Sequence, residues 1–280
     1  MAKIELENIS YVYSKGTPYE VTALDNVSVG IREGSITGII GHTGSGKSTF
    51  VQLLNGLERA SEGRVLLDGK DIWENPKKIR DVRFKVGMVF QYPEHQLFED
   101  TIYKDISFGP KNMGLSEEEI HRRVYEAAAY VGLDEALLEK SPFDLSGGEK
   151  RRAAIAGVMA MEPQVLILDE PTAGLDPRGR EQILAMVREY QRSRGTTVLL
   201  VTHSMEDVAR VADRVLVMDH GRAAMLDTVS AVFSRAEELE RIGLSIPAVA
   251  SRCWRWCGSI SARAAPPCCW SPTAWRTWRG

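Results

Sequence analysis

Residues 41–49, GHTGSGKST, combine three glycines, a lysine and several hydroxyl side chains in one short segment. Glycines let backbone N–H groups approach phosphate oxygens because no Cβ stands in the way. In the pattern Gly41-x4-Gly46-Lys47-Ser48, the lysine neutralises the terminal phosphates of a nucleotide and the serine ligates Mg²⁺. The predicted nucleotide-binding residues of this loop are Gly41, His42, Thr43, Gly44, Ser45, Gly46, Lys47, Ser48 and Thr49.

A second candidate group is the acid pair at the end of the apolar run VLILDE, residues 165–170. We expect Asp169 to hold Mg²⁺ through water, and Glu170 to orient or deprotonate the attacking water. On its own, Asp-Glu after a strand is an ordinary strand ending. The phosphate loop upstream is what favours the catalytic interpretation.

Polar residues also end two other apolar runs, KVGMVFQ at 85–91 and TTVLLVTH at 196–203. Phosphoryl transfer needs polar groups that converge on the γ phosphate, and ligands bind at the carboxyl ends of parallel strands. Gln91 is therefore predicted as a catalytic residue and metal ligand, and His203 as a catalytic residue. Tyr13, in an early strand, is predicted to stack on adenine, although a core or edge aromatic also fits.

The elements around these residues alternate between short apolar strands and amphipathic helices. Strands are expected at 35–41, 85–91, 164–170, 196–203 and 214–219, with helices near 178–192 and 204–212. This alternation predicts an α/β fold with a mostly parallel sheet covered on both faces. Before it, residues 4–13 read as an edge strand, residues 23–31 as a second strand, and residues 63–72 as a hairpin turning at Asp68-Gly69.

Residues from about 92 to 160 change to a helical pattern, with Ser116 as a predicted cap. Within this insertion, LSGGE at 145–149 starts a helix with a second Ser-Gly-Gly turn. A helix start of this kind is an anion site by geometry and dipole. One nucleotide needs only one cradle, so the residues alone leave the role of this second turn open.

The order of these motifs resembles that of the ATP-binding cassette ATPases, over roughly residues 3–235. The likeness matches residues 41–49 to the Walker A loop, Gln91 to the Q-loop, 145–149 to the signature, 165–170 to Walker B, 174–176 to the D-loop and His203 to the switch histidine. It implies a P-loop NTPase (RecA-like) core with an antiparallel β subdomain and a helical insertion, and ATP and Mg²⁺ as cofactors. It further implies that two cassettes pack head to tail, so that Ser146 and Gly148 contact the γ phosphate in the partner's loop.

One residue departs from the family pattern. The family most often has glutamine after Ser-Gly-Gly, and this chain has Glu149. A carboxylate beside triphosphate is unfavourable, so we expect Glu149 to face outward. We expect Arg151 and Arg152 on the solvated face of the same helix.

Within the family, residues 90–114, the TPYE insertion at 17–20 and the stretch 156–177 resemble the second ATPase of energy-coupling factor transporters. That likeness implies ATP-driven import of a vitamin or metal ion. The implied partners are a second ATPase subunit, a transmembrane coupling subunit whose helices sit near residues 91–110, and a substrate-binding membrane subunit. Residues 90–114 also fit an ordinary helical surface. The likeness leaves the cargo open, and it favours a heterodimer over a homodimer.

Two other function classes fit the sequence less well. Soluble cassette ATPases of DNA repair or translation generally carry long coiled-coil insertions or two tandem cassettes, and this sequence has neither. A cassette that only regulates, without hydrolysis, does not need Lys47, Asp169, Glu170 and His203 together. The importer is therefore the favoured function.

Composition is ordinary for a globular protein, with 44% hydrophobic and 26% charged residues and a net charge of -3. This charge gives no reason to expect nucleic acid as a partner. No uninterrupted apolar run reaches membrane-spanning length, and residues 1–10 do not resemble a signal peptide. We therefore expect a cytoplasmic location, and the resemblance to transporter ATPases implies a peripheral position at the cytoplasmic face of the cell membrane.

The expected domain organisation is an ATPase domain over residues 1–240, with its helical subdomain at about 92–160, and a C-terminal segment over 241–280. Residues 251–280 contain five arginines, all four cysteines and five of the six tryptophans, but no Lys, Asp or Glu. Cys253, Cys257, Cys268 and Cys269 lack the paired spacing of a zinc site. Our hypothesis is that this tail is read in a shifted frame or is otherwise aberrant.

Overall fold

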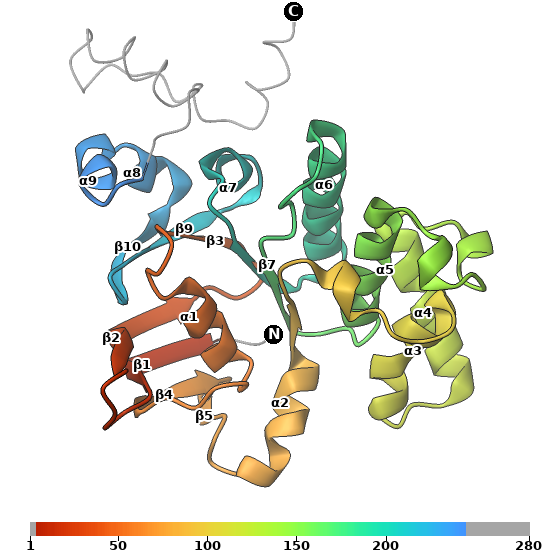
Figure 1. Ribbon diagram of the computed structural model, residues 1–280, viewed down its shortest axis with the longest axis horizontal. Coiled ribbons are helices and arrows are strands. Elements are labelled where there is room, and N and C mark those ends of the chain that lie inside the picture. Colours follow the sequence, from red (N-terminus) through yellow and green to blue (C-terminus); the bar gives the residue numbers. More distant parts are fainter. Residues whose placement is uncertain (1–3, 245–280) are drawn as a thin grey trace, which may run out of the picture.

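The computed structural model describes residues 4–244, which form two sheets and a group of helices (Figure 1). The hypothesis about residues 251–280 falls outside the described part of the chain, as does most of the predicted C-terminal segment. None of the described helices is long and apolar enough to cross a membrane.

The larger sheet has six strands in the order β10-β9-β3-β8-β7-β6. Its strands are β3 Ile36–Ile40, β6 Val86–Val89, β7 Val165–Asp169, β8 Thr197–Val201, β9 Arg214–Asp219 and β10 Arg222–Thr228. Neighbouring strands are parallel except β10, which pairs antiparallel with β9. Every residue of β3, β6, β7 and β8 is buried, as expected for parallel strands covered on both faces.

The smaller sheet is antiparallel, with the order β2-β1-β4-β5. It consists of β1 Ile4–Tyr13, β2 Val21–Ile31, β4 Glu62–Leu67 and β5 Lys70–Asp71. The prediction of β1 as an edge strand is wrong, since β1 pairs with both β2 and β4. Alternating burial identifies the buried face of a strand but not its neighbours, which depend on pairing with the later β4. The predicted hairpin turn is confirmed, with φ of 53° at Asp68 and 75° at Gly69.

Nine helices are present in residues 4–244: α1 Lys47–Leu54, α2 Ile79–Lys85, α3 Ile102–Asn112, α4 Glu117–Val131, α5 Gly147–Met159, α6 Pro177–Arg194, α7 Met205–Val211, α8 Val229–Phe233 and α9 Ala236–Arg241. The predicted cap of α4 is confirmed, because the Ser116 side chain accepts a hydrogen bond from the Glu119 backbone N–H. Helices α3, α4 and α5 pack together on one side of the six-stranded sheet, and the smaller sheet lies on the other side (Figure 1).

The two faces of the large sheet belong to different hydrophobic clusters. Leu166 and Leu168 of β7 lie in the cluster formed with α3 to α6. Val165 and Ile167 lie in the cluster formed with α1 and the small sheet. This alternation along one strand shows that both faces are covered, and it confirms the predicted α/β class with an antiparallel subdomain.

Candidate nucleotide site

The predicted phosphate loop connects β3 to α1 and fits tightly between other segments. A Cβ added to Gly41 would lie 2.3 Å from the Met218 carbonyl oxygen, and one added to Gly46 would lie 2.6 Å from the Ala23 carbonyl oxygen. Gly46 also has a φ of 95°, in the left-handed region that favours glycine. The loop therefore requires glycines for its close approach to β2 and β9 as well as for its own curvature.

Lys47 lies folded over this loop and is buried. Its Nζ donates hydrogen bonds to the carbonyl oxygens of Gly41 at 2.7 Å and His42 at 2.9 Å. Burial lowers the pKa of Lys47, and the nearby Glu170 and Asp169 carboxylates oppose that shift. Around it, Thr43, Gly44 and Ser48 are exposed, so the open side of the loop presents two hydroxyls and backbone groups to a ligand.

The N-terminus of α1 carries no cap from its own chain. Gly46 is the N-cap residue, no side chain bonds the free N–H groups, and the first turn contains no acidic residue. The first N–H groups of a helix and its dipole together attract anions. The residues present thus suit the phosphates of a nucleotide.

The predicted acid pair lies at the carboxyl end of β7. Asp169 is the last residue of the strand, and Glu170 follows with a φ of 51°, unusual for a residue other than glycine. Both are buried. Burial raises the pKa of both carboxyls, and for Glu170, where the charge of Asp169 adds to burial, it reaches about 7. A group that titrates near neutral pH is well suited to accept a proton.

The structure brings His203 to Glu170. Its Nδ1 lies 2.7 Å from Glu170 Oε1, while the His203 side chain stays 69% exposed. The contact follows from the strand order, because β7 and β8 are parallel neighbours and both residues follow their carboxyl ends. One ring nitrogen of His203 therefore contacts the carboxylate, and most of the imidazole remains open to a ligand.

Gln91 lies beyond the strand that was expected to contain it. Strand β6 ends at Val89, and a turn with Tyr92 at a φ of 54° follows, so the strand predicted over 85–91 is too long. Gln91 is exposed. Since β6 is the parallel neighbour of β7, Gln91 follows the same sheet edge as Asp169.

Tyr13 ends β1 close to the first turn of α1. Its hydroxyl lies 3.1 Å from Thr49 Oγ1, and its ring packs edge-on against Tyr11 with centroids 4.7 Å apart. The side chain is 38% exposed. An exposed ring held beside the phosphate loop is compatible with adenine stacking, which stays a prediction.

The signature turn is arranged differently from the phosphate loop. Ser146 is the N-cap of α5, and the Glu149 carboxylate accepts hydrogen bonds from the Ser146 backbone N–H at 2.8 Å and from its hydroxyl at 2.6 Å. The expectation that Glu149 faces outward is therefore wrong. The helix N-terminus attracts its own carboxylate into a capping box, and the hydrogen bonds from Ser146 lower the pKa of Glu149.

Arg151 is also not where it was expected. Its side chain is 4% exposed and its Nη2 lies 2.7 Å from Glu94 Oε1. It also donates to the carbonyl oxygens of Pro171 and Ala173. Arg151 thus links α5 to the segments that follow Gln91 and Glu170. A signal was present in the sequence, because Arg151 lies four residues before the buried Ile155 on one helical face.

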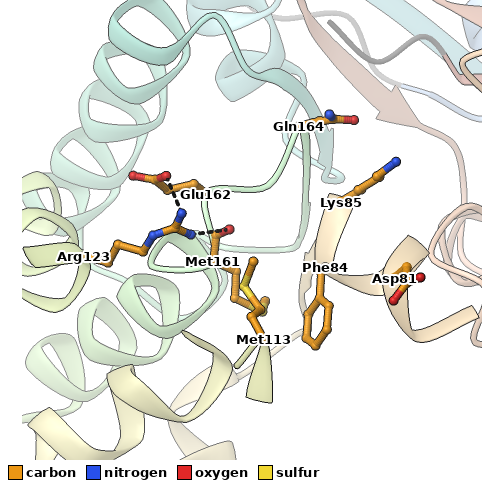
Figure 2. Close-up of a pocket in the computed structure, with 8 residues that line it drawn as sticks. All are labelled: Asp81, Phe84, Lys85, Met113, Arg123, Met161, Glu162 and Gln164. Carbon is orange, nitrogen blue, oxygen red and sulfur yellow. Dashed lines mark hydrogen bonds and ion pairs between the residues drawn. The ribbon is translucent and has the colours of Figure 1, made fainter. Parts of the chain in front are cut away.

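A separate hollow of about 290 Å³ lies between α2 and the segment that joins α5 to β7 (Figure 2). Phe84, Met113 and Met161 line it, and the Arg123 guanidinium at its rim lies 3.1 Å from Glu162. None of the predicted site residues lines it. The phosphate loop is therefore not part of this hollow.

Comparisons with known proteins agree with this geometry. The profile of the ABC transporter family matches residues 24–173. The energy-coupling factor transporter ATP-binding protein EcfA2 of Clostridium perfringens is 56% identical over 247 residues, 88% of this chain and 87% of its own. The EcfA2 protein of Symbiobacterium thermophilum is 57% identical over 245 residues, 88% of this chain and 85% of its own.

Solved structures show the same fold. The structure of cbiO1 from Clostridium perfringens, part of the ABC transporter complex cbiONQ, superposes with a TM-score of 0.76 at 41% identity, covering 89% of this chain and 98% of its own. A dimeric ATP-binding cassette in a post-hydrolysis state with ADP and Pi gives a TM-score of 0.73 at 29% identity, covering 81% and 98%. The chain therefore belongs to the ABC transporter family, among the energy-coupling factor transporter ATP-binding proteins.

Proposed function

We propose that this chain hydrolyses ATP with Mg²⁺ and thereby drives an energy-coupling factor importer of a vitamin or a metal ion. The proposal of ATP hydrolysis rests on one observation. Four residues lie together at one edge of the parallel sheet: Lys47, Asp169, Glu170 and His203. Glu170 is buried, next in sequence to Asp169 and 2.7 Å from His203 Nδ1. Such a group has the oxygen ligands, the base and the cation that phosphoryl transfer requires.

Each residue has a distinct proposed role. Lys47 and the amides at the start of α1 neutralise the phosphates, and Tyr13 stacks on adenine. Ser48 and Gln91 would supply oxygen ligands for Mg²⁺ and Asp169 would hold it through water, and the ion would neutralise charge on the phosphate oxygens. Glu170 orients the attacking water and accepts its proton, and His203 holds the Glu170 carboxylate and contacts the γ phosphate.

Hydrolysis is proposed to occur between two ATPase subunits. Ser146 is exposed, Gly148 is partly exposed, and the start of α5 lies apart from α1 (Figure 1). A signature turn that cannot serve its own phosphate loop is free to contact the γ phosphate held by a partner. Bound ATP then joins the two chains, and hydrolysis removes that bridge. The dimeric relative with ADP and Pi supports this arrangement by analogy.

The membrane partners are proposed from the relatives and from one surface. Phe98 and Phe108 are 65% and 46% exposed, and their rings meet edge-to-face with centroids 5.0 Å apart. Two exposed aromatic rings in contact with each other form a candidate partner surface. We assign this surface, within the predicted 91–110 region, to a transmembrane coupling subunit that also carries a substrate-binding membrane subunit. The chain then lies at the cytoplasmic face of the cell membrane, and nucleic acid has no role.

Replacing Glu170 tests the hydrolytic part. Glu170→Gln keeps the shape of the side chain but removes the base, so turnover should fall by roughly 10²- to 10⁴-fold while ATP binding persists. Steady-state ATPase assays and size-exclusion chromatography with ATP measure the loss of turnover and the trapped dimer. Glu189→Gln, an exposed acid on α6, is the matched control. Undiminished ATPase activity in Glu170→Gln would refute the catalytic role.

Co-purification tests the importer against a soluble cassette. A tagged chain expressed in its native host should retain a polytopic membrane protein through detergent extraction. Isolation of the chain with only soluble DNA-repair or translation proteins would contradict the importer and favour the alternative function. Mass spectrometry of the retained protein would also identify the cargo class.

A further inference from the structure

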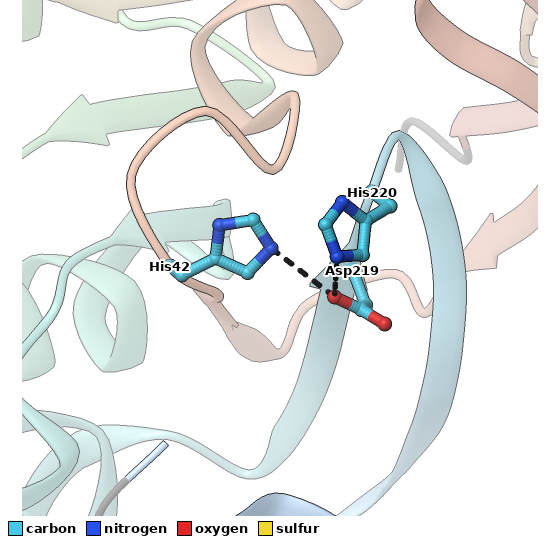
Figure 3. A group of neighbouring side chains, drawn as sticks. All are labelled: His42, Asp219 and His220. Carbon is cyan, nitrogen blue, oxygen red and sulfur yellow. Dashed lines mark hydrogen bonds and ion pairs between the residues drawn. The ribbon is translucent and has the colours of Figure 1, made fainter. Parts of the chain in front are cut away.

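Two histidines and one aspartate meet where the phosphate loop faces the turn between β9 and β10 (Figure 3). His42 belongs to the loop, Asp219 ends β9, and His220 lies in the turn to β10. Asp219 Oδ1 lies 3.1 Å from His42 Nε2 and 3.8 Å from His220 Nε2. One potential ligand atom from each residue lies within 4.8 Å of the others. The proposed hydrolytic mechanism uses none of these three side chains.

The hydrogen bonds of His42 direct its Nε2 toward the Asp219 carboxylate. His42 Nδ1 lies 2.8 Å from the Thr43 carbonyl oxygen, which only accepts, so Nδ1 carries the proton. In a neutral ring, Nε2 then presents a lone pair to the Asp219 carboxylate, which also only accepts. A cation between these two atoms, which lie 3.1 Å apart, would be bound by both acceptors. A ring N–H donated to a backbone carbonyl is also the usual support of a metal-ligating histidine.

We infer that His42, Asp219 and His220 bind a divalent transition metal ion of the zinc class. Imidazole nitrogens with one carboxylate are typical ligands for such ions, whereas Mg²⁺ prefers oxygen. Metal–ligand bonds of about 2.0–2.1 Å place neighbouring ligand atoms of a tetrahedral site roughly 3.3 Å apart. The distances of 3.1 and 3.8 Å from Asp219 Oδ1 lie on either side of that value. His220 is exposed, so the fourth position is open to water.

The backbone already fixes the segments that carry these ligands. The Gly221 N–H donates to the Ser45 carbonyl oxygen at 3.1 Å, which joins the turn to the phosphate loop. A Cβ at Gly41 would meet the Met218 carbonyl oxygen, so the loop and β9 are in contact there as well. The metal ion adds a side-chain link to this junction. Because His42 O also accepts from Lys47 Nζ, metal binding and nucleotide binding influence each other through the same loop.

Cobalt(II) is the probe for this site, because tetrahedral Co²⁺ absorbs visible light and substitutes for zinc. The full nucleotide-free chain is titrated with Co²⁺ as wild type, His220→Asn and His121→Asn. Asparagine tolerates the φ of 43° at position 220, and His121 on α4 lies outside the cluster. Wild type and His121→Asn should bind Co²⁺ equally, and His220→Asn should bind it more than about tenfold more weakly.

The same titration distinguishes Co²⁺ bound by cysteines from Co²⁺ bound by the cluster. Thiolates produce an intense charge-transfer band in the near ultraviolet, and His220→Asn keeps all four cysteines. Only the visible bands that disappear in His220→Asn are therefore assigned to the cluster. Asp219→Asn repeats the test if His220→Asn does not fold. Identical Co²⁺ spectra and affinities in wild type and a folded cluster variant would overturn the proposal, as would the absence of visible bands.

Discussion

Two helices of this chain begin at glycine-containing turns, but their N-termini differ. The N-terminus of α1 has Gly46 as N-cap, no side-chain cap and no acid in its first turn. The N-terminus of α5 has Ser146 as N-cap and closes a capping box with Glu149. The free N–H groups of α1 are therefore left for a ligand, whereas those of α5 are partly satisfied within the chain.

The two N-termini also differ in what holds them. The phosphate loop is fixed by close backbone approaches at Gly41 and Gly46. The α5 start is exposed and is anchored from one turn further along, where Arg151 pairs with Glu94. The proposed primary phosphate site is thus built into the sheet edge, while the proposed second site lies at the surface and is linked to both the Gln91 and Glu170 segments. We therefore expect only the first N-terminus to form a complete phosphate site within one chain.

Among changes at these two helix N-termini, the largest expected effect comes from Lys47. Lys47→Ala removes the only cation that this chain places over the phosphate loop in the part that the structure describes, so ATP hydrolysis should fall by about 100-fold or more. Fluorescent ATP-analogue binding and steady-state ATPase activity measure the effect. Lys77→Ala, on an exposed turn, is the matched control. Wild-type ATP affinity in Lys47→Ala would show that α1 is not the primary phosphate site.

Ser146 provides the next test, since it separates action within a chain from action on a partner. Its hydroxyl would contribute one hydrogen bond to a charged phosphate, and losing it should cost about tenfold or more in turnover at the affected site. Two mixed dimers of tagged chains carry the same substitutions, Lys47→Ala and Ser146→Ala, either on separate chains or on one chain.

The trans arrangement predicts activity only when the substitutions are on separate chains. One intact phosphate loop then faces one intact signature turn. With both substitutions on one chain, the remaining wild-type loop faces the altered turn, and ATPase activity should drop. The reverse ranking would mean that Ser146 serves its own nucleotide and that the two helix N-termini act together in one chain.

The features that could be predicted from the sequence are those that depend on interactions between residues close together in the chain. The α/β class, the Asp68-Gly69 turn and the Ser116 cap depend on local patterns, and all three are observed. The contact of Glu170 with His203 follows from two parallel strands ending at one edge. These features need only neighbouring residues or the general rule for parallel sheets.

The features that sequence analysis missed depend on partners from distant segments. Arg151 is buried because Glu94 and the carbonyl oxygens after Glu170 surround it. His42 meets Asp219, which lies 177 residues away. The central position of β1 requires pairing with β4. No local pattern encodes these encounters, although the helical spacing of Arg151 and Ile155 was readable.

Glu149 gives the smallest and most specific test of the comparison. Glu149→Gln keeps an oxygen that accepts from the Ser146 N–H but removes the negative charge, so α5 should become more like α1 toward an anion. A charge in the first turn is worth about 0.3–1 kcal/mol, which is roughly a two- to fivefold tighter hold on the partner's ATP.

The rate of ATP dissociation from the Glu170→Gln dimer, with and without Glu149→Gln, measures this effect. Glu118→Gln makes the same change in the first turn of α4, which has no nucleotide role, and so controls for helix stability. ATP dissociation that is unchanged or faster would mean that the Glu149 carboxylate moves away when the dimer closes. The N-termini of α1 and α5 would then be equivalent once ATP lies between them.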